Sequence, residues 1–143
     1  MPLNTFSTGR DVTLTVVTPS GPISFNLITG FHSSPVTGQV KVKGIDGITR
    51  HALFPDGWTG GFDIERSDST VDDYFAQLED NYYQGLNIGS STITETITEP
   101  NGAVTQYRYL QVLLQLDDAG SWMGDQTVKQ KISFMAARRK KIA

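Results

Sequence analysis

The sequence predicts a mainly β protein with one α-helix and an extended hairpin arm. Thr, Ser and Gly are plentiful whereas helix-forming residues are sparse. Several segments alternate apolar and polar residues, and only one segment changes to a helical spacing. A chain of 143 residues can bury its own core, so we take residues 1–143 as a single domain.

The first hairpin is predicted near the N-terminus. Residues 11–17 alternate in the period of two that is typical of a half-buried strand. Residues 18–22 have turn chemistry, and Ile23, Phe25 and Leu27 then share one face of a second strand.

A second hairpin is predicted after a break at residues 33–35. Residues 36–45 and 48–54 flank Asp46-Gly47, a pair that suits a type I′ turn because Gly readily adopts positive φ. The apolar face is thin, so this hairpin is expected to act as an arm that needs a partner. Its cations are Lys41, Lys43 and Arg50.

The single helix follows a short strand, residues 62–66, which comes after Gly60-Gly61. Apolar residues from Val71 to Tyr82 form one helical stripe. Ser69 is placed to cap the start and Gly85 to end the helix. The acidic residues of its polar face are Asp72, Asp73 and Asp80.

Three further strands complete the prediction. Residues 92–99 and 104–116 flank Asn101-Gly102, a strong hairpin signal. The former strand places threonines on one face, and isoleucines and glutamates on the other. A last strand over residues 128–136 directs Lys129 and Lys131 outward, before a basic tail at residues 138–141.

Charge is segregated along the chain. Residues 55–99 carry ten acidic side chains and one cation, a local charge of −9, whereas the remainder carries +6. A small protein with opposite charge on different parts of its surface is suited to bind another copy of itself or a charged polymer. The overall net charge of −3 argues against nonspecific nucleic-acid binding. Assembly is therefore favoured over catalysis.

Composition excludes several other classes. The chain has no cysteine, so disulfides, thiolate metal sites and thiol catalysis are excluded. No apolar run approaches the ~20 residues that cross a membrane, and the N-terminus lacks a secretory signal. We expect folding in cytosol-like conditions and no membrane insertion.

No catalytic residue, metal site or cofactor is predicted. His32 and His51 have no nucleophile or carboxylate at a recognised spacing. Asp117, Asp118 and Asp125 lack the pattern of a calcium loop. Two alternatives stay open. One is a hydrolase that uses Asp63 and Glu65. The other is a carbohydrate-binding β-sandwich, whose aromatic residues would be Trp58, Tyr107, Tyr109 and Trp122.

Three segments together resemble one known family. They are residues 60–66 leading into the helix at 71–79, residues 93–97 with 106–109, and residues 130–139. The chain resembles the tail tube proteins of long-tailed bacteriophages, most closely those of contractile-tailed phages. Tubes of tailocins and type VI secretion systems share the fold and are a further alternative.

The resemblance implies a structural virion protein rather than an enzyme. The implied fold is a two-sheet β-sandwich or split barrel with a flanking helix. Hexameric rings would stack into a tail tube that conducts DNA as a transient passenger during ejection into the host. Expected partners are sheath, baseplate and tail-terminator proteins, with assembly in the host bacterial cytoplasm.

Site residues follow from that implied assembly. We expect an anionic, hydroxyl-rich lumen, and an acidic helix face that looks outward. The lumen candidates are Thr92, Thr94, Glu95, Thr96, Thr98 and Glu99. The contact candidates between subunits or rings are Lys41, Lys43, Asp46, Arg50, Arg138, Arg139, Lys140 and Lys141.

Overall fold

The mainly β architecture with one helix is confirmed. The computed structural model describes residues 9, 12–19, 21–23, 28–86 and 89–143. Phe25 and Leu27 of the first predicted hairpin lie outside the described residues. The elements are β1 (Val12–Thr18), β2 (Gly21–Ile23), β3 (Ile28–Lys43), β4 (Thr49–Glu65), α1 (Thr70–Tyr83), β5 (Ser91–Thr98), β6 (Val104–Asp118), β7 (Lys129–Ala136) and β8 (Arg138–Lys141).

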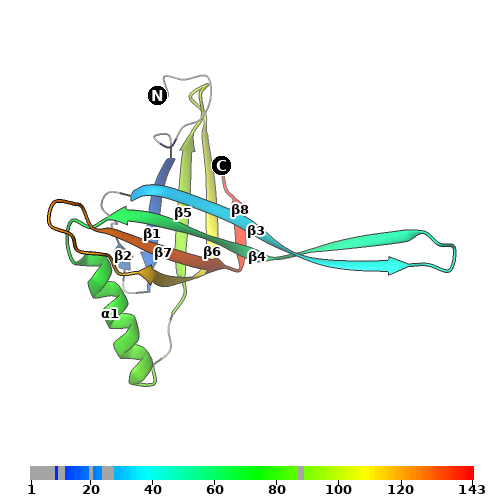
Figure 1. Cartoon of the computed structure of the whole chain (residues 1–143). Coiled ribbons are helices and arrows are strands. Elements are labelled where there is room, and N and C mark those ends of the chain that lie inside the picture. The colour runs from blue at the N-terminus through cyan, green and yellow to red at the C-terminus, as the bar shows by residue number, and fades with distance from the viewer. Residues whose placement is uncertain (1–8, 10–11, 20, 24–27, 87–88) are drawn as a thin grey trace.

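The strands form two antiparallel sheets that share β6 (Figure 1). Sheet A has the order β2-β1-β5-β6-β8, and sheet B has the order β6-β7-β4-β3. Strand β6 passes from one sheet to the other at Gln111, which has a φ of 53°. Ala137 lies beside this corner, where its N–H donates to Leu110 O at 3.0 Å, and joins β7 to β8. Strands that switch sheets at such bends form the corners of crossed sandwiches.

The core lies between the two sheets. Tyr109 and Val112 of β6 are fully buried, and Phe134 of β7 stacks on Phe31 with ring centroids 5.9 Å apart. Gly60 allows this packing, because a Cβ there would meet the Phe134 ring and the His32 carbonyl oxygen.

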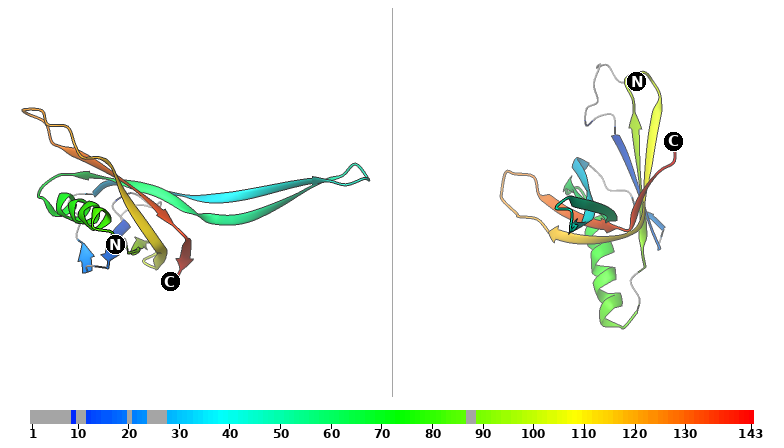
Figure 2. Two further views of the ribbon diagram at one scale, coloured as in Figure 1. Left: turned by 90° about the horizontal axis from the view of Figure 1, so that it is seen from below. Right: turned by 90° about the vertical axis from the view of Figure 1, so that its right-hand side faces the viewer.

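One long hairpin replaces the separate strands predicted between residues 28 and 66. β3 and β4 pair along almost their whole length, so the break expected at residues 33–35 is wrong. Pro35 is accommodated because β3 pairs only with β4 among the described strands, and the register shifts between Pro35 and Thr37. The segment expected as a short strand at residues 62–66 is the end of β4. The outer part of this hairpin extends far beyond the sandwich (Figures 1 and 2).

The turn at Asp46-Gly47 differs from the expected type I′ turn. Gly47 N–H donates to Gly44 O at 3.0 Å, and Gly44 N–H donates to Ile48 O at 3.1 Å. Only Gly47 of the pair Asp46-Gly47 has a positive φ, which is 79°. This pattern is a three-residue loop, a type I turn followed by a left-handed glycine. Asn101-Gly102 repeats it, with Gly102 at a φ of 88°.

Helix α1 has the predicted position. Ser69 precedes it, but the Asp68 carboxylate accepts the first free N–H, that of Thr70, at 3.0 Å, and so replaces the expected Ser69 cap. The C-terminal end is a Schellman motif, because Leu86 N–H donates to Asn81 O and Gly85 has a φ of 76°. No helix in the described part of the chain is long and apolar enough to cross a membrane.

Candidate assembly surfaces

The outer part of the β3-β4 hairpin, residues 36–54, is the first candidate surface, and we call it the arm. Directly opposite residues of an antiparallel pair share a face. Val40 therefore shares one face with Ala52, and Gly38 shares it with Phe54. Val42 belongs to the same face, where it lies opposite Arg50 near the tip, and is 56% exposed. The arm thus carries an apolar strip that the described part of this subunit leaves uncovered.

The other face of the arm is cationic. Lys41 lies opposite His51, and Lys43 lies opposite Thr49. The remaining contact candidates, Asp46 and Arg50, form an ion pair with each other at 2.9 Å. The Arg50 guanidinium holds the pKa of Asp46 below its usual value, with help from the Ile48 N–H. These two residues stabilise the turn, and Lys41 and Lys43 are left to meet a partner.

The predicted basic tail is a strand in the structure, which corrects that expectation. β8 pairs with β6, and its side chains alternate between two faces. Arg138 and Lys140 are exposed on the outer face of sheet A. Arg139 points inward, where its guanidinium carbon lies 3.4 Å from the Tyr107 ring centroid and 4.6 Å from that of Trp58. Arg139 is therefore an internal residue of the subunit.

A buried polar cluster is centred on Tyr109, whose ring centroid lies 5.9 Å from the Arg139 guanidinium carbon. The Tyr109 hydroxyl lies 2.9 Å from Glu95 Oε2 and 2.9 Å from Ser33 Oγ. The carboxylate can only accept, so Tyr109 donates to Glu95 and accepts from Ser33. Burial raises the pKa of Tyr109 to about 12, and the adjacent Glu95 contributes in the same direction. These contacts link sheet A to the base of the arm.

The lumen candidates divide between two faces of β5. Glu95 is only 7% exposed and belongs to the cluster just described. Glu99 accepts a hydrogen bond from Thr105 Oγ1 at 2.9 Å beyond the end of the strand. The outer face of β5 carries the other candidates, which are Thr92, Thr94, Thr96 and Thr98. The candidates thus present a hydroxyl surface, without the Glu95 carboxylate.

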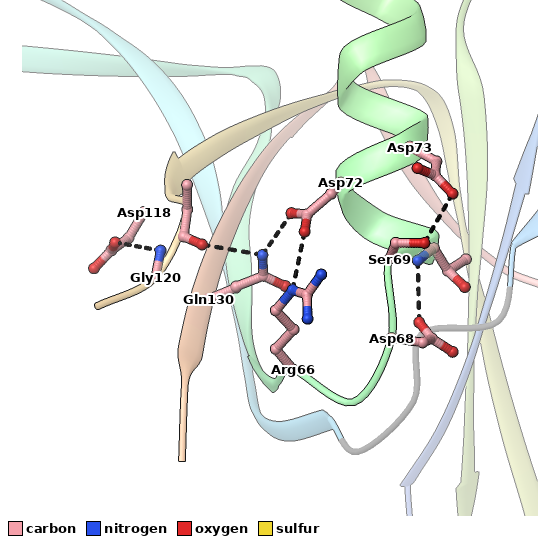
Figure 3. A network of polar contacts seen from close by, with 10 residues as sticks. Arg66, Asp68, Ser69, Asp72, Asp73, Asp118, Gly120 and Gln130 are labelled. Carbon is pink, nitrogen blue, oxygen red and sulfur yellow. Dashed lines mark hydrogen bonds and ion pairs between the residues drawn. The ribbon is translucent and has the colours of Figure 1, made fainter. Parts of the chain in front are cut away.

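The acidic helix face is also divided. Asp72 accepts from Arg66 Nε at 2.9 Å and from Gln130 Nε2 at 2.8 Å (Figure 3). Gln130 is 1% exposed and also donates to Ala119 O. Asp72 thus anchors the helix to β7, whereas Asp73 and Asp80 are exposed.

The inward positions of two residues in these networks, Gln130 and Arg139, were not predicted from the sequence. Gln130 lies at an inward position of β7 between Val128 and Ile132, so the alternation already marks it as buried. The chain turns a corner at Ala137, between β7 and β8, and this corner decides on which face Arg139 lies. No local signal in the sequence indicates the corner.

The open enzymatic alternative is not supported by the cavity at Glu65. Asp63 lies opposite Lys131, and Glu65 lies opposite Lys129. The cavity beside Glu65 has a volume of only about 10 Å³, which is less than a sugar needs. Within the described residues, no group of three or more histidines and carboxylates is close enough to hold a metal ion.

The aromatic residues also do not form the flat platform of a carbohydrate-binding module. Trp58 and Tyr109 meet edge to face with an interplanar angle of 76° around Arg139. Trp122 is exposed elsewhere, beside Arg66.

No protein-family model matches the chain, and no curated protein does. Solved structures match along nearly its whole length. A chain of the tube-terminating cap of the anti-feeding prophage has a TM-score of 0.66 at 10% identity, covering 99% of this chain and 94% of that one. A chain of the sheath–tube complex of the extracellular contractile injection system PVC has a TM-score of 0.62 at 13% identity, covering 91% and 88%. A chain from the tail of a gene transfer agent particle, solved with C6 symmetry, has a TM-score of 0.58 at 10% identity, covering 96% and 100%.

These similarities establish the fold. The chain has the fold found in tubes, tube caps and tails of phage-like particles, and the resemblance seen in the sequence is confirmed at that level.

Proposed function

We propose that the chain is a structural, non-enzymatic subunit of a phage-like tail tube. Hexameric rings of it stack into a conduit for DNA, which passes through as a transient passenger. The observation that carries the proposal is the arm, which projects from the sandwich with an uncovered apolar face (Figure 2). Ile45 at its tip is fully exposed and Phe54 is 54% exposed. A monomer gains nothing from this surface, whereas an arm that packs on the next ring buries it.

Ring closure is best supported at the edges of sheet B. Sheet A ends in β2, which has three residues, and in β8, which has four residues, all of them cations. Short and charged edges resist pairing with another chain. Sheet B ends in residues 28–34 of β3 and residues 113–118 of β6, whose outer sides pair with no other described strand. Head-to-tail pairing of these two edges can close a ring.

This closure moves the proposed lumen from β5 to the outer face of sheet B. Small or polar residues of β4 and β7 dominate that face, such as Thr59, Gly61 and Ser133. Asp63 and Glu65 lie opposite Lys131 and Lys129, so its charge is nearly balanced. A polar surface without a cationic excess lets a phosphate backbone slide without strong contacts. The threonine face of β5 then points to the outside of the tube.

The implied partners follow from the same proposal. A tube in a virion tail needs a baseplate below, a terminator above and, in contractile tails, a sheath around it. The chain would be assembled in the cytoplasm of a host bacterium. The similarity to a tube-terminating cap favours a second candidate, a terminator ring that does not extend into a tube. A tube subunit of a tailocin or another injection system has the same architecture.

Electron microscopy and sedimentation velocity of the purified full chain test the proposal. We expect rings or tubes in the wild type. Val40→Glu with Phe54→Glu is expected to leave rings but no tubes, because both charges enter the apolar face of the arm. Gln39→Glu with Thr49→Glu adds the same charge to the opposite face and is the matched control.

Three results are decisive. Rings of the wild type that never stack favour the terminator. Equal loss of tubes in both variants would show that the apolar face has no special role. A chain that stays monomeric at all concentrations and salt conditions would overturn the assembly function.

A further inference from the structure

The outer face of sheet A carries an unusual row of charges. Thr94, Arg108 and Lys140 lie directly opposite one another on β5, β6 and β8. Arg138 lies one step along β8, opposite Leu110. Like charges directly opposite each other destabilise a sheet. A sequence that keeps two such cations side by side indicates a partner that neutralises them.

The described part of the subunit does not supply that partner. Between described residues the ion pairs are Arg50–Asp46 and Arg66–Asp72, and neither involves this face. Its described side chains on β1, β5, β6 and β8 include no carboxylate. They are Thr13, Thr15, Val17, Thr92, Thr94, Thr96, Thr98, Val104, Gln106, Arg108, Leu110, Arg138 and Lys140.

Helix α1 presents the opposite charge. Its first half is attached to the core through the buried Val71 and through Phe75. The second half projects below the sandwich (Figure 1). Asp80 is exposed there without an ion pair to a described residue, and Tyr82 and Tyr83 are 65% and 76% exposed. A projecting helix end that carries a carboxylate and two exposed tyrosines is suited to a protein contact.

We propose that the outer face of sheet A is the docking site for the projecting half of α1 from a second copy of the chain. The inference rests on the proposed ring assembly and names a contact between neighbours within it. Asp80 of this projecting half meets Arg108 and Lys140, which lie directly opposite each other. Tyr82 and Tyr83 pack on threonine methyl groups of β5.

Geometry and charge favour a second copy over other occupants. In the two views of Figure 2, α1 and the C-terminal strand lie apart on the subunit, so the two surfaces cannot meet within one copy. A contact between different surfaces of identical subunits is heterologous and can close a ring. Nucleic acid is also complementary to the cations, but the chain's net charge of −3 opposes its approach.

Cysteine cross-linking tests the contact directly, because the chain has no cysteine of its own. Asp80→Cys with Lys140→Cys is expected to give a ladder of disulfide-linked oligomers in assembled rings. Asp80→Cys with Lys131→Cys is the control, since Lys131 is an exposed lysine on sheet B. Rings that form without the ladder, or an equal ladder in the control, overturn the docking and leave the tube proposal intact. If the wild type forms no rings, both proposals fail together.

Charge reversal supplies a second measurement. Arg108→Glu with Lys140→Glu, or Asp80→Lys, is expected to weaken ring formation by at least about tenfold, since each brings like charges together. A mixture of the two variants is expected to restore rings in which they alternate, because every helix then meets a sheet of opposite charge. The single variant Arg108→Glu places a carboxylate directly opposite Lys140, so it should stabilise the folded monomer. Loss of rings in this variant can then be distinguished from unfolding. If neither charge reversal affects ring formation, the docking is refuted. It is also refuted if the wild type binds an oligonucleotide and Arg108→Glu abolishes that binding while rings persist.

Discussion

The buried hydroxyl of Tyr109 offers the sharpest test of the interior. Tyr109→Phe keeps the ring, which packs at 5.3 Å from Phe134 and 6.2 Å from Trp58. It removes the donor that lies 2.9 Å from the Glu95 carboxylate. Glu95 is 7% exposed, so little water can replace the lost donor. The expected effect is therefore the loss of a buried hydrogen bond, with the packing of the ring unchanged.

The size of the loss follows from the charge on the acceptor. A hydrogen bond to a charged group contributes roughly 1.5–3 kcal/mol, and a buried charged acceptor left unpaired adds to the cost. We expect Tyr109→Phe to lower the free energy of unfolding by about 2–3 kcal/mol. For a chain of 143 residues this corresponds to a fall in Tm of roughly 6–12 °C. Glu95→Gln keeps an acceptor without the charge, so its effect should be smaller.

Urea unfolding of the monomer at high salt and low protein concentration measures this difference. Tyr107→Phe is the control on the same strand. The Tyr107 ring stacks on Arg139, but its hydroxyl has no hydrogen bond to a described residue. A change below about 0.5 kcal/mol is expected for it. If Tyr109→Phe costs no more than this control, the proposed role of the Tyr109–Glu95 bond in stability is refuted.

Three further outcomes are expected. The raised pKa of Tyr109, about 12, means that its stabilising contribution is complete below pH 10 and is lost as the pH rises toward 12. The difference between the absorbance titrations of wild type and Tyr109→Phe should therefore centre near 12, and a centre near 10 would contradict the burial argument. Gly60→Ala should lower the free energy of unfolding by about 2 kcal/mol or more, because its methyl group meets Phe134 and the His32 carbonyl. Gly38→Ala, which meets only ordinary contacts on the same hairpin, should change stability by less than about 1 kcal/mol in urea unfolding. Assembly followed by sedimentation should weaken steeply with added salt, and assembly indifferent to salt would exclude opposite charges as its basis.

Most local structure could be predicted from the sequence because it depends on near neighbours. The stripe from Val71 to Tyr82 gave the helix, and Gly85 gave its end. The loops at Asp46-Gly47 and Asn101-Gly102 were located correctly, although the type I′ turn expected at Asp46-Gly47 was wrong. The type depends on how the flanking strands pair, since one added loop residue changes the register of the whole hairpin.

Burial of polar residues could not be predicted in the same way. Alternation placed Glu95 on the face opposite the threonines, but both faces of that strand looked polar. Only the approach of Tyr109 and Ser33 from two other strands makes the interior acceptable to its carboxylate. Glu95 is buried within the subunit, and the proposed lumen therefore does not include it.

The sequence by itself determined the β-rich class, the one helix, the two glycine turns and the separation of acidic from basic segments. These properties arise from propensity, spacing and charge within a few residues of each other. The tertiary structure decided that β3 and β4 run through Pro35 into the arm, that β6 and β8 turn a corner at Gln111 and Ala137, and that Arg139 lies inside while Lys140 lies outside. Those outcomes depend on strands that pair across long stretches of chain, so no local pattern contains them.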